Sequence, residues 1–179
     1  PGIDSWNRMT VKPINGKNII NNKIVKYEKF LSENKINEMK KAAVLVCFFK
    51  RKDEYYLPLI KRPMHEKNHP GQIALPGGAM EENETLEKTA LREAFEEVGI
   101  IPDKVKILGK MTPLPVPVSE YMITPFIGIT ENEPKWNING KEVDELIILR
   151  FKDLIDSNNG YYEDWNINGN ILRVPIFKI

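Results

Sequence analysis

The sequence predicts an α+β fold in which helices pack on a mixed sheet. Three observations lead to this prediction: a continuous apolar run at 42–50, a strongly patterned helix at 84–98, and further strand-like segments on both sides of that helix. An apolar run of this kind is typical of a strand that is buried on both faces. Strands interleaved with one dominant helix favour layers of helix and sheet around a shared core.

Length and composition indicate one globular domain. The chain has 179 residues, of which 41% are hydrophobic and 28% are charged, and these values are ordinary for a domain with one core. We therefore expect a single domain over 1–179. An irregular extension at 1–24 is predicted to turn at Asn15-Gly16.

Charge and hydropathy exclude several classes of partner. The net charge is +1, which argues against a nucleic-acid-binding surface or a polybasic membrane anchor. No stretch approaches the roughly 20 apolar residues that a membrane helix needs, and no signal peptide opens the sequence. The single cysteine, Cys47, lies in the apolar run and is expected to be buried and inert. These features predict a cytoplasmic protein, either a monomer or a homodimer.

The elements before the patterned helix follow from period and turn signals. Residues 25–41 place apolar side chains loosely at helical spacing and predict a helix. Residues 42–50 are the buried strand, and 55–61 read as its hairpin partner across a charged turn. Residues 62–76 contain prolines, histidines and a glycine, and are expected to be mostly loop.

The elements after the helix are mostly strands. The helix is expected to stop at Gly99, with Pro102 beyond it. A proline-rich loop is expected at 112–120, and the tract WNING at 136–140 ends in an Asn-Gly turn signal. Strands are predicted at 105–111, 122–130 and 146–151, and a hairpin about Asn168-Gly169 at 161–177.

The patterned helix carries an acidic face. At about 100° per residue, Glu93, Glu96 and Glu97 fall within an arc of roughly 100°. Because Glu93 and Glu97 lie one turn apart, their repulsion destabilises the helix unless a positive charge offsets it. Hard oxygen ligands grouped in this way suit Mg²⁺ or Mn²⁺. The neighbouring arc is apolar and is expected to be buried; it contains Ala90, Leu91, Ala94, Phe95 and Val98.

Two further features support a metal site. Arg92 beside the acidic face can pair with Glu96 or reach back to Glu84. The loop before the helix contains Gly77-Gly78, where backbone can approach a ligand closely and offer a carbonyl to a metal. Together these features suit metal-assisted attack of water on phosphorus. The alternative is a solvated acidic face held by surface ion pairs, which leaves the glycine pair and the arginine unexplained.

Eight residues of this stretch match the pattern of the Nudix box position by position, and the chain therefore resembles the Nudix hydrolase superfamily. The matching residues are Gly78, Glu84, Arg92, Glu93, Glu96, Glu97, Gly99 and Ile100. Ala94 departs mildly from the pattern, since a bulkier aliphatic residue is usual there. The resemblance covers roughly 41–156, which it implies to be the core of the domain, and it implies an α/β/α sandwich with a mixed central sheet. It also implies hydrolysis of a nucleoside diphosphate linked to another moiety.

The same resemblance implies roles for individual residues. Glu93, Glu96 and Glu97 are expected to bind Mg²⁺ or Mn²⁺ together with the Gly77 carbonyl, and Arg92 to orient the carboxylates. The general base varies within the superfamily. Glu93, Glu97 or a glutamate from a later loop remain alternatives.

A second resemblance concerns the substrate. Residues 59–62 and 69–78 look like the extra signature of the coenzyme A diphosphatase branch, with Pro63, Lys67 and Leu75 in place of its usual serine, arginine and phenylalanine. The branch implies cleavage of coenzyme A or its derivatives to 3′,5′-ADP and 4′-phosphopantetheine. The residues expected to bind substrate are Lys61, Arg62, Lys67, Gly71, Gln72 and Gly78. For the three basic residues, the alternative is a solvated basic loop.

Two later acids complete the candidate site. Glu142 and Glu145 precede a predicted strand on a loop, from which either can supply a late carboxylate or simply face solvent. The hydrolase hypothesis therefore has two rivals. One is a Nudix enzyme acting on a nucleotide sugar, a dinucleotide or an oxidised nucleotide, and the other is a nucleotide-binding module without catalysis.

Overall fold

The computed structural model describes residues 19–20, 23–24, 38–66, 69–116, 119–167 and 170–177. The chain divides into two compact units, one formed by residues 39–152 and the other by 1–38 with 153–179. The turn predicted at Asn15-Gly16 and most of the helix predicted at 25–41 lie outside the described residues. The single-domain assignment stays a prediction.

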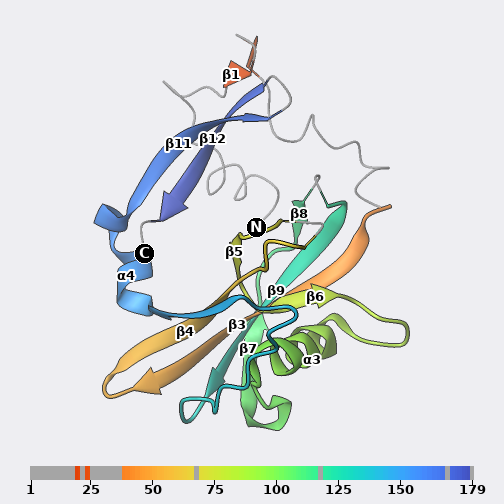
Figure 1. The fold of residues 1–179 in the computed structure, drawn as a ribbon, viewed down its shortest axis with the longest axis vertical. Helices are drawn as coiled ribbons and strands as arrows, with labels where there is room; N and C mark the ends of the chain where they lie inside the picture. The colour runs from red at the N-terminus through yellow and green to blue at the C-terminus, as the bar shows by residue number, and fades with distance from the viewer. Residues whose placement is uncertain are drawn as a thin grey trace. The chain divides into compact units, whose positions relative to one another are not determined.

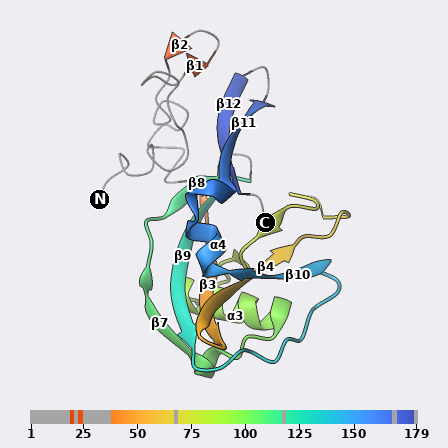
Figure 2. The same cartoon turned by 90° about the vertical axis from the view of Figure 1, so that its left-hand side faces the viewer.

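A mixed sheet forms the centre of the unit 39–152 (Figure 1). Its main strands run in the order β10-β4-β3-β9-β7, and β3 pairs parallel with β9 while the other pairs are antiparallel. Figure 2 shows β9 and β7 on one side of β3, and β4 and β10 on the other. The bounds are β3 Lys40–Arg51, β4 Glu54–Lys61, β7 Val105–Lys110, β9 Tyr121–Thr130 and β10 Glu145–Arg150. This arrangement confirms the predicted α+β class with a mixed sheet.

Three short strands pair with parts of the main strands. They are β5 Ile73–Ala74, β6 Gly77–Ala79 and β8 Leu114–Val116, which pair with β4, β3 and β9 respectively. The prediction of a loop at 112–120 was wrong for Leu114–Val116, which form β8, with Pro115 opposite Met122. Proline is compatible with an edge strand, where its missing N–H costs no ladder bond.

One face of the sheet is covered by helix α3, Leu86–Val98. Along β3 alternate residues are fully buried, among them Leu45 and Cys47, and this face meets the apolar side of α3 at Ala90 and Ala94. The thiol of Cys47 is buried as expected, and burial raises its pKa to about 12. One prediction for this helix was wrong. Phe95 is 50% exposed, because the covered arc is narrower than the apolar arc of the sequence.

Capping residues define both ends of α3. Thr85 caps the first turn, its hydroxyl accepting the Lys88 N–H at 3.3 Å, so the helix begins at Leu86 and Glu84 lies in the preceding loop rather than on the helix. Gly99 ends the helix in the left-handed region, with φ at 81°. Its N–H donates to the Phe95 carbonyl at 2.9 Å.

The segments after β9 complete the described chain. The strand predicted at 146–151 ends at Arg150, and Phe151 begins α4, Phe151–Ile155. In the other unit, β11 Gly160–Ile167 and β12 Asn170–Phe177 form an antiparallel hairpin, as predicted, with the turn itself outside the described residues. Shorter elements are β1 Ile19–Ile20, β2 Lys23–Ile24, and 3₁₀ helices at Pro102–Lys104 and Ser157–Asn159. Within the described ranges, no helix is long and apolar enough to span a bilayer.

Substitution of Gly99 by alanine is predicted to lower the free energy of unfolding by about 2 kcal/mol or more. A β-carbon at Gly99 would lie 2.8 Å from Asn137 atoms, and the left-handed backbone alone costs an L-residue roughly 1–2 kcal/mol. Gly140→Ala is the control, because a β-carbon there meets nothing within 4 Å. Urea denaturation of both variants measures the difference, and equal effects would contradict the assigned role of Gly99.

Candidate active site

The acidic face of α3 meets the backbone of β6. The Glu97 side chain is 4% exposed, and its Oε2 accepts the Gly77 N–H at 2.9 Å. A β-carbon on Gly78 would lie 2.5 Å from the Glu93 carboxyl group, and one on Gly77 would lie 2.3 Å from the Ala43 carbonyl oxygen. The two glycines therefore let β6 sit between β3 and two carboxylates of the helix.

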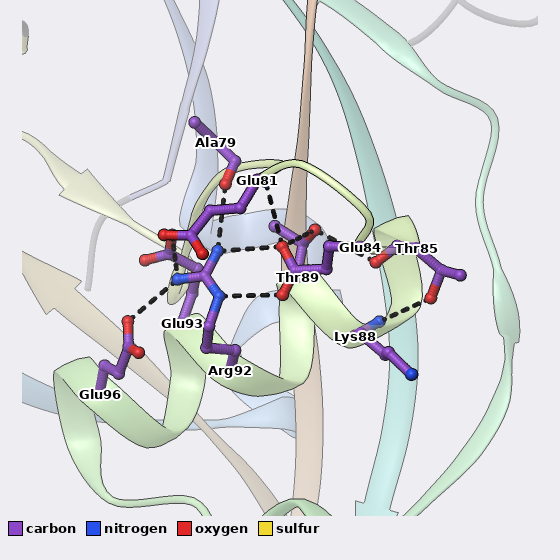
Figure 3. A network of polar contacts seen from close by, with 9 residues as sticks. All are labelled: Ala79, Glu81, Glu84, Thr85, Lys88, Thr89, Arg92, Glu93 and Glu96. Atoms are coloured by element: carbon purple, nitrogen blue, oxygen red, sulfur yellow. Dashed lines mark hydrogen bonds and ion pairs between the residues drawn. The ribbon is translucent and has the colours of Figure 1, made fainter.

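Arg92 connects the acidic face to the loop that precedes α3 (Figure 3). Its Nε and Nη2 donate to the two oxygens of Glu84 at 2.9 and 3.1 Å, which makes a bidentate pair. Its Nη1 donates to Glu93 and to Glu96, at 3.0 Å in each case. Nη2 also donates to the Ala79 carbonyl at 3.2 Å, immediately after Gly78. Arg92 thus joins three carboxylates and the end of β6.

Glu84 supports this arrangement from the loop. Its carboxylate accepts the Thr89 hydroxyl at 2.7 Å and the Glu81 N–H at 3.2 Å, in addition to Arg92. The bond from Arg92 is the main reason that the pKa of Glu84 is lowered to about 2. Glu84 is therefore an ionised anchor for Arg92 across the relevant pH range.

The two carboxylates nearest β6, those of Glu93 and Glu97, have raised pKa values instead. Burial raises the pKa of Glu97 to about 8, against the opposing effect of the Gly77 N–H, and the charge of Glu93 adds to the increase. Burial also raises the pKa of Glu93, although Arg92 opposes that increase. Buried carboxylates side by side are costly as anions, and a cation between them would remove that cost.

Two basic residues of the β4–β5 region differ in their surroundings. Lys61 Nζ lies 3.4 Å from the Asp144 carboxylate and 3.9 Å from that of Glu145, so its charge is already balanced. Arg62 pairs with Glu66 at 2.7 Å, and its charge also acts on Glu97. The Nε of Arg62 is buried and has no hydrogen-bond partner in the described part of the chain.

Glu142 and Glu145 are both exposed, but they lie near different groups. The Glu142 N–H donates to the Asn139 carbonyl, and the Asn139 N–H donates to the Glu97 carbonyl, so the backbone at Glu142 is linked to the end of α3; its charge adds to the raised pKa of both Glu93 and Glu97. Glu145 begins β10, and its carboxylate lies 3.9 Å from Lys61 Nζ. Because Glu145 already has this partner, Glu142 stays the candidate for a late carboxylate, and its role stays a prediction.

Comparison with known proteins identifies the fold family. The NUDIX domain matches residues 39–168, which is most of the chain. The chain belongs to the NUDIX domain family.

Curated relatives of this NUDIX chain carry general names. It is 39% identical over 105 residues to "Uncharacterized Nudix hydrolase NudL" of Enterobacter sp. (strain 638), covering 58% of this chain and 54% of the relative. It is 33% identical over 100 residues to "Nudix hydrolase 3" of Caenorhabditis elegans, covering 54% of this chain and 42% of the relative. The chain thus spans about half the length of these relatives.

Solved structures support the NUDIX fold. The Nudix hydrolase RenU of M. smegmatis aligns with a TM-score of 0.56 at 21% identity, covering 66% of this chain and 74% of that one. A C. elegans Ap4A hydrolase aligns with a TM-score of 0.55 at 18% identity, covering 65% of this chain and 83% of that one. At these identities the likeness establishes the fold alone.

Other sequence-predicted residues of this NUDIX site have structural contacts. Gly71 donates its N–H to the Arg62 carbonyl at 3.1 Å, and Gln72 accepts the Arg62 N–H through its carbonyl at 2.9 Å. These bonds close the turn between β4 and β5. Lys67 lies outside the described residues, so its predicted role stays a prediction.

Sequence reasoning missed one part of the NUDIX site. The N–H groups of Asn137 and Asn139 donate to the carbonyls of Val98 and Glu97, at 3.1 and 2.9 Å. The WNING tract therefore closes the last turn of α3, beside the buried acid. Its only signal in the sequence was the turn propensity of Asn-Gly, which does not reveal a tertiary partner.

The raised pKa of Glu97 predicts how stability depends on pH in metal-free buffer. The unfolded chain releases this proton near pH 4.5, whereas the folded chain holds it until about pH 8. The folded state therefore binds more protons in that window, and the free energy of unfolding should fall as pH rises through it. Urea denaturation with EDTA measures this slope, which should be shallower in Glu97→Gln. Identical slopes in both proteins would contradict the assignment.

Proposed function

We propose that this NUDIX chain is a hydrolase that cleaves a nucleoside diphosphate linked to another moiety, using Mg²⁺ or Mn²⁺ at the acidic face of α3. The observation that carries the proposal is the pair Glu93 and Glu97 against the backbone of Gly77-Gly78, where Glu97 is buried and the Glu93 side chain is 17% exposed. Two neighbouring acids withdrawn from solvent in this way are unfavourable as anions, and a bound cation would stabilise them.

The chemistry of the donor set fits a hard divalent cation. Glu93, Glu96 and Glu97 offer carboxylate oxygens from one helix face. Pro76 and Met80 direct their hydrogen bonds to β3, whereas the Gly77 N–H donates to Glu97; by the alternation of an antiparallel strand, the Gly77 carbonyl also points away from β3. We assign the metal to these three carboxylates and that carbonyl.

The same acids have protein partners in this structure. Across the described residues, no three acidic, histidine or cysteine side chains converge closely enough to hold an ion by themselves. Arg92 holds Glu93 and Glu96, and the Gly77 N–H holds Glu97. We infer that Glu93, Glu96 and Glu97 would hold the ion after rotation of their side chains, since Arg92 keeps Glu93 and Glu96 on one helix face and Glu97 lies one turn from Glu93.

The roles of the residues follow from their contacts. A bound divalent cation neutralises phosphate oxygens and lowers the pKa of an attacking water. Glu97 is assigned as the proton acceptor, because the Gly77 N–H fixes its Oε2 and leaves Oε1 to receive a proton. Glu93 and Glu142 are the alternatives. Arg92 sets the orientation of Glu93 through Nη1.

Coenzyme A or a derivative is the proposed substrate, with 3′,5′-ADP and 4′-phosphopantetheine as products. The support is the resemblance of 59–62 and 69–78 to the coenzyme A diphosphatase branch and the surroundings of Arg62. A buried donor without a partner is unfavourable, and a substrate phosphate would satisfy the Arg62 Nε. Both Arg62 and Lys61 have a carboxylate partner, but the Glu66 pair uses the Arg62 Nη2 and leaves Nε available, so Arg62 is the stronger candidate for a phosphate contact.

Another nucleotide substrate is the second candidate, favoured by the balanced charge of Lys61 and by the three departures from the coenzyme A signature. Incubation with coenzyme A, NADH, ADP-ribose and 8-oxo-dGTP, followed by chromatography of the products, separates the two. The proposal expects 3′,5′-ADP from coenzyme A with Mg²⁺ and none with EDTA. Turnover of another compound but not of coenzyme A would refute the substrate assignment. Binding of Mg²⁺ and nucleotide without any product would indicate a non-catalytic module.

Substitution of Glu97 by glutamine is predicted to lower kcat by roughly a hundredfold or more, because it removes both a metal ligand and the proton acceptor. Steady-state kinetics measure the loss, and circular dichroism checks that the fold is retained. Glu87→Gln is the matched control, since Glu87 lies exposed in the first turn of the same helix and should leave kcat unchanged. Full activity in a folded Glu97→Gln protein would remove Glu97 from the mechanism.

A further inference from the structure

The segment from Glu133 to Asp144, here called the strap, connects β9 to β10 and runs beside α3 (Figure 1). It has no regular secondary structure, yet it is fixed at three places along its length. Such a segment would be free to move if only its ends were held. The contacts at the three places therefore decide where the strap holds Glu142.

The first anchor is at the upstream end of the strap. The Glu133 carboxylate accepts two hydrogen bonds from Arg51, that from Nε at 2.8 Å, and a third from the Trp136 indole N–H at 3.1 Å. The Trp136 ring meets the edge of Phe49, with centroids 5.4 Å apart. The Arg51 guanidinium also lies 5.2 Å from the ring centroid of Tyr56. This anchor ties the strap to the β3–β4 hairpin.

The second anchor is at the end of α3. The Asn137 and Asn139 N–H groups donate to the carbonyls of Val98 and Glu97, which would otherwise have no partner within the helix. Asn139 therefore bonds directly to the main chain of the buried acid. A change in the position of Asn139 would be transmitted to Glu97.

The third anchor is a turn centred on Asn139. Its carbonyl accepts the N–H groups of Glu142 and Val143, at 3.0 and 2.9 Å, and its Oδ1 accepts the Lys141 N–H at 3.2 Å. Val143 is 2% exposed, and the Asp144 N–H donates to the Lys61 carbonyl at 2.9 Å. Glu142 is thus held between a closed turn and a buried residue.

We propose that Asn139 is a positioning residue: its main-chain bonds to the Glu97 carbonyl and the Glu142 N–H, in a turn that its side chain closes, set how far the Glu142 carboxylate lies from Glu97. The inference rests on the proposed function, because it requires Glu142 to act in the same site as Glu97. The main-chain bonds of Asn139 hold the backbone of Glu142 near the end of α3, and the closed turn limits its movement toward solvent. The Asn139 side chain contributes by closing the turn on Lys141, which an alanine cannot do.

A double-mutant cycle tests this role. The four proteins are the wild type, Asn139→Ala, Glu142→Gln and the double variant, each measured for kcat and KM. We expect Asn139→Ala to lower kcat/KM by roughly threefold to tenfold in the wild-type background, the range expected for one lost hydrogen bond. In the Glu142→Gln background the same change should cost less than about twofold, because the carboxylate that Asn139 positions is gone.

Two further variants serve as matched controls. Asn139→Asp keeps an acceptor for the Lys141 N–H and should remain within about twofold of the wild type. Lys135→Ala alters the same strap at an exposed side chain, so activity should be unchanged. Equal losses from Asn139→Ala in both backgrounds would show a purely structural role. A kcat/KM equal to that of the wild type in Asn139→Ala or in Glu142→Gln would also overturn the proposal. So would a loss of kcat/KM in Asn139→Asp equal to the loss in Asn139→Ala.

Binding of Mn²⁺ without substrate gives a second readout. Electron paramagnetic resonance titration should show weaker binding in Asn139→Ala than in the wild type, and no such difference in the Glu142→Gln background. If the wild type turns over no nucleotide, the proposed function fails while this titration still tests the positioning role. If the wild type is active and the effects are additive in both assays, only the positioning role fails.

Discussion

The guanidinium of Arg92 is the interaction on which the rest of the site depends. Three acids of the box converge on it, and it also bonds to the carbonyl at the end of β6. Without this charge, Glu93 and Glu96 would repel each other on one helix face. Glu84 in turn holds the guanidinium by a bidentate pair, which explains why an acid outside the helix belongs to the same motif.

Close approach of backbone to side chain is the second constraint. The β6 strand can lie against the helix because Gly77 and Gly78 have no β-carbons to collide with β3 or with Glu93. The consequence is a buried Glu97 whose only described hydrogen-bond donor is a main-chain N–H. A carboxylate placed in this way has little solvation of its own, so its ionised form depends on a nearby cation.

Local patterns predicted much of this molecule, and tertiary contacts explain the remainder. The buried strand, its hairpin partner and the acidic helix follow from period and turn signals, which act over a few residues. The exposure of Phe95 and the pairing of Lys61 with Asp144 depend on which surfaces meet, so no local pattern encodes them. The contact between Asn139 and Glu97 was missed for the same reason, because it joins backbone groups of segments 42 residues apart.

Anomalous diffraction from Mn²⁺-soaked crystals tests most directly whether the acids of α3 form a cation site. An anomalous peak is expected between Glu93, Glu97 and the Gly77 carbonyl, with Arg92 still bonded to Glu84. The opposite result would be a map without a peak at this position, with Glu97 still hydrogen-bonded to Gly77 and the remaining acids paired only with Arg92. That result would contradict a metal-dependent hydrolase.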